Sequence, residues 1–212
     1  MKFSGFTGFL IVFIIIGLSV LPTSAQNLQK NTNMTTYDTA TFGSGCYWCS
    51  QAIFERVKGV ISSTAGYSGG KGSDPTYEEV SRGKSGYAEG VQVVYDPEQI
   101  NFKSLLEIFW KMHNPTTLNR QGADVGTQYR SAIFYHNEAQ KLSAQQYKEK
   151  LRKAKIWDDP IVTEISLFKT FYPAEKYHQD YYKKNPAAAY CQFVITPKIE
   201  KFEKLFSDQL KK

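Results

Sequence analysis

The sequence predicts an α/β fold in which helices pack on a single mixed sheet. Strand-like and helix-like segments alternate along the chain, which is typical of layered α/β domains. Hydrophobic residues make up 42% of the 212 residues and aromatic residues 15%, which is enough to build a packed core. The length suits one domain with a short extension. Together these observations exclude a largely disordered chain.

The first half of the chain contributes alternating strand and helix patterns. The strongest strand pattern places Val91, Val93 and Tyr95 on one face. Asp74 and Asn101 are expected to cap the helices that follow them, because their short polar side chains accept hydrogen bonds from free backbone N–H groups. In order, the predicted elements are a strand at 37–43, a helix at 47–59, a strand at 60–70, a helix at 74–83, a strand at 88–97 and a helix at 101–114.

The second half continues the alternation after an irregular interval. The stretch "NPTTLNRQGADVGTQ", residues 114–128, has neither a helical nor a strand period. Stretches this long without regular structure are uncommon inside compact domains and tend to be functional, so we expect it to line a polar pocket. The later predicted elements are a strand at 129–136, a helix capped by Asn137 at 137–154, a strand at 161–168, a helix at 173–185 and a helix at 197–210.

The N-terminus has the pattern of a secretory signal. Lys2 precedes an apolar run, Phe9–Leu21, which is shorter than the ~20 residues of a membrane span, and small residues lead to Ala25. We expect residues 1–25 to be a cleaved signal peptide, 26–36 a polar tether and 37–212 a single domain. The protein would then be exported, periplasmic or extracellular. An uncleaved membrane anchor is the alternative.

The charge of the chain gives little indication of a macromolecular partner. The formal net charge is +6 and the isoelectric point is about 9.0. The lysines alternate with acidic residues around 138–158, which is the pattern of an exposed helix face. We therefore expect no nucleic-acid partner, and a monomer.

The three cysteines indicate a reactive thiol. An exported protein usually pairs its cysteines in structural disulfides, but Cys46, Cys49 and Cys191 are odd in number. "GSGCYWCSQ" places Cys46 where a helix should begin, and the positive end of a helix dipole would lower the pKa of its thiol. The Cys-x-x-Cys spacing also occurs in thioredoxin-like redox proteins. Tyr47 and Trp48 would either form a pocket wall or pack in the core.

A series of motifs resembles one enzyme family. "GCYWC", "GYSGG", "DPTYEEV", "YAEGVQVVYDP", "NRQGADVGTQYRSAIFY", "YPAEKYHQDYY" and "YCQFVITPK" are similar, in this order, to segments of the peptide methionine sulfoxide reductase A family. The resemblance covers 41–206. It implies an α/β (α+β) two-layer sandwich with a ferredoxin-like core, and reduction of methionine sulfoxide in oxidised proteins and peptides. The sequence departs from the family pattern at Tyr47, usually Phe, and at Gln51, commonly Glu.

The resemblance also implies roles for particular residues. Cys46 would be the nucleophile and Glu89 the acid that protonates the sulfoxide oxygen, which Tyr77 and Tyr129 would hold by hydrogen bonds. Burial should raise the pKa of Glu89 by about two units, because an ionised carboxylate cannot act as an acid. Asp124 would line the pocket. The methyl group of the substrate would lie against Tyr47 and Trp48.

Turnover then requires a second thiol and a reductant. A cysteine sulfenic acid on Cys46 would condense with Cys191 or Cys49 to a disulfide, and a thioredoxin-like protein would reduce that bridge. The sequence leaves the choice open. Helix spacing of Cys46 and Cys49 and a mobile small-residue segment before Cys191 favour Cys46–Cys191 as the first bridge. No cofactor is implied, and His113, His136 and His178 lack the spacing of a metal site.

Two other classes of function are compatible with parts of the sequence. One is an exported thiol–disulfide oxidoreductase that uses Cys46 and Cys49 on protein disulfides. The other is an inactive binding module that has kept the pocket. The first does not account for Glu89, the irregular interval or the third cysteine, and only Gln51 and Tyr47 point to the second.

Overall fold

A computed structural model describes residues 1–2, 5 and 36–211, and residues 36–211 belong to one compact unit. The predicted signal peptide and tether lie almost wholly outside the described residues, so their assignment stays a prediction. Within the described part of the chain, no helix is both long and apolar enough to cross a membrane.

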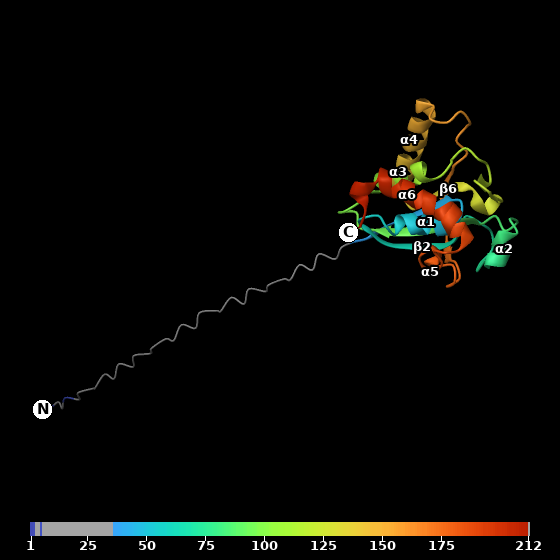
Figure 1. Cartoon of the computed structure of the whole chain (residues 1–212). Helices are drawn as coiled ribbons and strands as arrows, with labels where there is room; N and C mark the ends of the chain where they lie inside the picture. Colours follow the sequence, from blue (N-terminus) through green and yellow to red (C-terminus); the bar gives the residue numbers. More distant parts are fainter. Residues whose placement is uncertain (3–4, 6–35, 212) are drawn as a thin grey trace. The chain divides into compact units, whose positions relative to one another are not determined.

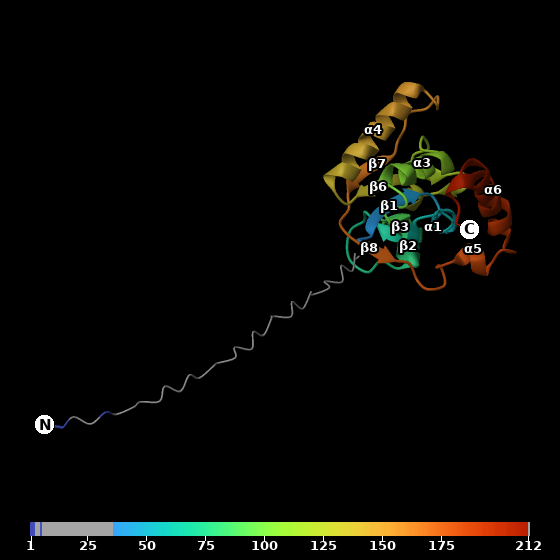
Figure 2. The same ribbon diagram turned by 90° about the vertical axis from the view of Figure 1, so that its left-hand side faces the viewer.

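A mixed six-stranded sheet forms the centre of residues 36–211 (Figure 1), and its strands follow the order β7-β6-β1-β3-β2-β8 (Figure 2). All neighbouring strands are antiparallel except β6 and β7, which are parallel. A two-stranded ribbon, β4-β5, lies outside this sheet. The strands are β1 (Asp38–Ser44), β2 (Val60–Ser68), β3 (Ala88–Tyr95), β4 (Arg120–Gln121), β5 (Asp124–Val125), β6 (Ser131–Tyr135), β7 (Glu164–Leu167) and β8 (Phe171–Pro173).

The helices α1, α5 and α6 gather beside the central strands, while α4 packs near β6 and β7 (Figure 2). Helix α1 contacts both β2 and β3, so its first turn lies close to the centre of the sheet. The helices are α1 (Tyr47–Phe54), α2 (Tyr77–Ser81), α3 (Phe102–Met112), α4 (Glu138–Ala154), α5 (Tyr181–Lys184) and α6 (Thr196–Leu205), with the 3-10 helices η1 (Thr127–Tyr129) and η3 (Ser207–Gln209) and the π-helix η2 (Cys191–Ile195).

The main core lies between the sheet and these helices. Phe42 of β1 is fully buried and stacks on Phe54 of α1 and Phe109 of α3. Alternation along a strand sends neighbouring residues to opposite faces, and Ala88 and Phe134 belong to a smaller separate cluster. Burial of the large rings anchors α1, and with it the segment that carries the first two cysteines.

The sequence predicts the N-cap residue correctly for two helices and wrongly for a third. Asn101 and Asn137 cap α3 and α4 as predicted, each accepting a hydrogen bond from a backbone N–H. The prediction that Asp74 caps α2 is wrong. Thr76 caps α2, because Thr76 and Glu79 form a reciprocal capping box two residues later.

The irregular interval is ordered by short elements. The ribbon β4-β5 and the 3-10 helix η1 lie within or at the end of 114–128. The side chain of Gln121 forms hydrogen bonds with both the backbone N–H and the carbonyl of Asn114.

Two other regions differ from the predicted elements. The helix predicted at 173–185 is reduced to α5, and neither β8 nor the π-helix η2 is predicted from the sequence. The α/β class with a mixed sheet is confirmed. The finer two-layer sandwich with a ferredoxin-like core stays a prediction.

Candidate active site

The turn between β1 and α1 places the first cysteine of the motif. Gly45 adopts φ +87°, and a Cβ there would come within 2.6 Å of the Gln121 side chain, so glycine is required. Cys46 follows as the N-cap residue of α1, with φ −54° and ψ 124° and no side-chain cap. Its side chain therefore lies at the helix N-terminus without belonging to the helix.

Glu89 approaches the same helix start from β3. Its side chain is 2% exposed, and Oε2 accepts a hydrogen bond of 3.2 Å from the backbone N–H of Tyr47. Burial raises the pKa of Glu89 to about 8, the N–H of Tyr47 opposes that rise, and the charges of Asp124 and Cys49 add to it. Glu89 is therefore mainly protonated at pH 7, as an acid must be.

Cys46 and Cys49 behave as a coupled pair of thiols. Burial, the hydrogen bond to Cys49 and the negative charges of Cys49 and Glu89 raise the pKa of Cys46. The hydrogen bond from Cys46 lowers the pKa of Cys49, burial opposes this, and the charge of Lys198 lowers it further. The expectation of a lowered Cys46 pKa is thus wrong for the free protein, because burial raises that pKa most and the nearby Cys49 and Glu89 raise it further.

Cys49 is close to Cys46 despite the predicted helix spacing. That prediction assumed that both residues belong to α1, but Cys46 lies in the extended N-cap conformation. Each of the two thiols shifts the pKa of the other, so the sulfurs lie in the same small region. Cys191 starts η2, is fully buried and is a free thiol, and its own pKa is raised by burial and by the charge of Cys49. All three cysteines therefore meet in one region.

The two predicted oxygen-binding tyrosines face the same charges. Burial and the negative charges of Glu89 and Cys46 raise the pKa of both Tyr77 and Tyr129. Tyr77 is held by its backbone N–H, which donates to Glu175, and Tyr129 lies at the end of η1. Both phenols therefore stay protonated near neutral pH and can donate hydrogen bonds.

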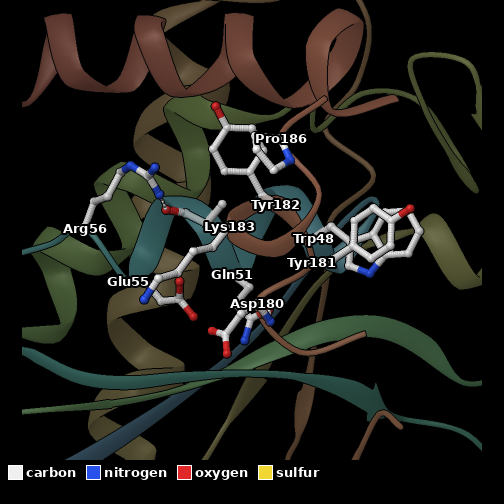
Figure 3. Close-up of a pocket in the computed structure, with 10 residues that line it drawn as sticks. Trp48, Gln51, Glu55, Arg56, Asp180, Tyr181, Tyr182, Lys183 and Pro186 are labelled. Atoms are coloured by element: carbon white, nitrogen blue, oxygen red, sulfur yellow. Dashed lines mark hydrogen bonds between the residues drawn. The ribbon is translucent and has the colours of Figure 1, made fainter. Parts of the chain in front are cut away.

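Trp48 and Tyr47 occupy different environments. Trp48 stacks face to face on Tyr181, with ring centroids 3.6 Å apart (Figure 3). Tyr47 is 1% exposed, and its hydroxyl lies 3.5 Å from that of Tyr67, which donates to Glu175. The extra hydroxyl of Tyr47 thus has a partner.

Gln51 connects the cysteine helix to the segment that carries α5. Its Nε2 donates to the carbonyl of Ser63 and to Oε1 of Gln179, while its Oε1 accepts from the backbone N–H of Asp180. A glutamate could not donate either of the first two bonds. Gln51 also lines a cavity of about 150 Å³ together with Glu55 and Asp180 (Figure 3). There burial and the Asp180 carboxyl raise the pKa of Glu55 to about 7, so a neutral amide avoids a third nearby carboxylate.

Sequence reasoning missed three residues of this region. Tyr190 donates a 2.6 Å hydrogen bond to Oδ2 of Asp124 and lowers the pKa of both Cys46 and Cys49. Lys198 lies beside Cys49. His178 is 3% exposed among aromatic rings, and neither of its ring nitrogens has a partner within 36–211. The motif "YCQFVITPK" contains two of them, but its spacing alone gave no sign that they face the helix start.

Comparison with known proteins identifies the family. A family model described as peptide methionine sulfoxide reductase matches residues 38–210. The peptide methionine sulfoxide reductase MsrA 1 of Rhodopirellula baltica is 51% identical over 82% of this chain and 90% of its own length. This chain belongs to the peptide methionine sulfoxide reductase A family. The predicted enzyme class is therefore confirmed: the protein is a methionine sulfoxide reductase.

Further similarities extend along nearly the whole length of other methionine sulfoxide reductases. The MsrA of Natronomonas pharaonis is 51% identical over 81% of this chain and 97% of its own. The crystal structure of Mxr1 from Saccharomyces cerevisiae in reduced form superposes with a TM-score of 0.67 at 34% identity, covering 75% of this chain and 91% of that one. The similarity thus covers more than nine tenths of each of these two proteins.

Proposed function

We propose that this reductase acts on the S epimer of methionine sulfoxide, peptide-bound or free, with Cys46 as nucleophile and Glu89 as acid. The observation that carries the proposal is the buried Glu89, whose pKa is raised to about 8 where its carboxyl meets the helix start beside Cys46. A sulfoxide oxygen is a poor leaving group until it is protonated. A carboxyl that is neutral at pH 7 supplies that proton.

In the first half-reaction the sulfur of Cys46 takes the oxygen of the substrate. Glu89 protonates the sulfoxide oxygen, the thiol proton of Cys46 returns to Glu89, and the products are methionine and a sulfenic acid on Cys46. With Glu89 neutral, one of the charges that raise the Cys46 pKa is absent. Tyr77 and Tyr129 hold the oxygen by hydrogen bonds.

The remaining pocket residues orient the substrate. Asp124, fixed by Tyr190, lines the polar side. Trp48, fixed by its stacking on Tyr181, and the buried ring of Tyr47 provide an apolar surface for the methyl group. Rigid stacking favours one placement of the methyl group, and hence one epimer at sulfur.

In the second half-reaction a thiol condenses with the sulfenic acid and releases water. The contact between Cys46 and Cys49 supports Cys49 as the first partner, which reverses the preference drawn from helix spacing. Cys191 can then exchange with Cys49. A thioredoxin-like protein reduces the resulting bridge by thiol–disulfide exchange. We also propose that the enzyme is a monomer. The signal pattern of residues 1–25 supports an exported, periplasmic or extracellular location.

An epimer assay tests this function. The protein is incubated separately with S- and R-methionine sulfoxide peptides and dithiothreitol, and methionine is measured. We expect the S epimer to be consumed and the R epimer to remain. Equal consumption of both epimers would contradict the fixed methyl site. Reduction of insulin without any methionine would instead indicate a thiol–disulfide oxidoreductase, the alternative that family membership does not favour.

A further inference from the structure

Lys198 directs a positive charge toward Cys49. It lies on α6, is only partly exposed, and its Nζ is 3.9 Å from Sγ of Cys49. Within residues 36–211 it forms no ion pair with a carboxylate. A partly buried ammonium without a carboxylate partner is costly unless another anion compensates it. The thiolate of Cys49 is the anion that this position offers.

The surroundings of the contact strengthen the attraction. A cavity of about 10 Å³ adjoins both residues, and most of its other lining is apolar: Ile53, Phe54, Ile108, Phe109 and Met112, with Ser44 and Ser50. Charges attract more strongly where water is excluded. The charge of Lys198 also acts on the buried His113, whose pKa falls to about 4 mainly through burial. The positive charge of Lys198 therefore affects two buried groups, Cys49 and His113.

Several groups act on the Cys49 sulfur, and Lys198 supplies a positive charge. The hydrogen bond from Cys46 favours the thiolate most strongly, and Tyr190 favours it as well. Burial and the negative charge of Asp124 oppose it. Glu89 and Cys191 also lie within electrostatic range, since the Cys49 charge raises the pKa of both. Lys198 differs from Cys46 in one respect: it is unchanged when Cys46 is oxidised.

We propose that Lys198 is a catalytic residue of the second half-reaction: its ammonium keeps Cys49 as a thiolate, and this thiolate attacks the sulfur of the Cys46 sulfenic acid. The inference rests on the proposed function, because it needs the sulfenic acid as its starting point. It assigns a distinct task to each sulfur. Cys46 accepts the oxygen, and Cys49 removes it.

The atoms and electrons balance without an outside oxidant. A bond forms between the sulfurs of Cys49 and Cys46, and the S–O bond of Cys46 breaks with its electron pair on oxygen. The departing hydroxide takes one proton, which replaces the proton that Cys49 released to solvent on ionising. The sum is one sulfenic acid and one thiol converted to one disulfide and one water.

Single-turnover kinetics of Lys198→Met test the inference. Reduced enzyme is mixed with an S-methionine sulfoxide peptide without reductant, and methionine and disulfide are measured separately after acid quenching. We expect methionine to form at the wild-type rate and the disulfide to form about tenfold more slowly near pH 7, because less Cys49 is thiolate. The deficit should shrink as the pH rises, and Lys198→Arg should restore most of the rate. Lys204→Met removes an exposed charge from the same helix and serves as the matched control.

A second measurement isolates the thiolate from turnover. In the Cys46→Ser/Cys191→Ser background Cys49 is the only cysteine, so absorbance at 240 nm reports its ionisation. We expect Lys198→Met to shift that titration upward by about one pH unit. An unshifted titration, an unchanged rate of disulfide formation, or a first bridge mapped to Cys46–Cys191 would each overturn the inference. Absence of methionine in the wild-type mixture would instead contradict the proposed function.

Discussion

Replacing Cys46 with serine abolishes methionine formation in our account, while the fold survives. A serine hydroxyl is nearly the same size as the thiol but is not a soft nucleophile for sulfur. Cys46 has no side-chain cap hydrogen bond, so the replacement removes no capping interaction from α1. The measurement is methionine release from an S-methionine sulfoxide peptide, with circular dichroism as the check on folding.

The matched control for this change is Cys191→Ser. It removes another buried thiol of the same region but leaves the nucleophile in place. We expect it to release its first methionine at the wild-type rate. Measurable turnover by a folded Cys46→Ser protein would remove Cys46 from the nucleophilic role.

Glu89→Gln lowers the rate by about 10²- to 10⁴-fold at pH 7, the usual contribution of general acid–base catalysis. The amide keeps the shape of the side chain but has no proton to give. In the wild type the acid form is the active one, so activity should fall as the pH rises through about 8, the folded-state pKa of Glu89. Glu89→Gln should lack that decline. The measurement is the single-turnover rate from pH 6 to 10.

The stability of the same variant separates lost chemistry from lost structure. A carboxyl whose pKa is raised from 4.5 to about 8 destabilises the folded state increasingly as the pH rises between these values. Glu89→Gln removes that cost, so at pH 7 it should be more stable than the wild type by about 3 kcal/mol. Glu55→Gln, which removes another carboxyl of raised pKa at the end of α1, is the control. A near wild-type rate at pH 7 in Glu89→Gln would show that another group protonates the oxygen.

Features set by neighbouring residues in the sequence were predictable. Asn101 and Asn137 cap their helices because the capping bond spans only three residues. The alternation of Val91, Val93 and Tyr95 likewise gives the buried strand β3. The motif order also brought Cys46, Glu89 and Asp124 forward as site residues, and the structure places them in one region.

Features set by distant contacts were not predictable from local patterns. The pKa of Cys46 is raised mainly by burial, which depends on the whole fold, and further by Cys49 and by Glu89, about forty residues away. Lys198, about one hundred and fifty residues away, helps to lower the pKa of Cys49. The helix dipole alone predicts a lowered pKa for Cys46, which is the wrong direction, because burial and these neighbours outweigh it. The segment before Cys191 has the small residues of a mobile loop, yet Cys191 opens the π-helix η2 and is fully buried. Tertiary packing decided both cases.

Chemical trapping of the sulfenic acid tests the central claim most directly. The Cys49→Ser/Cys191→Ser variant is mixed with an S-methionine sulfoxide peptide and dimedone, without reductant, and the adduct is located by peptide mass spectrometry. We expect one methionine and one dimedone adduct per enzyme, on Cys46. Methionine formed without an adduct on Cys46 would contradict it.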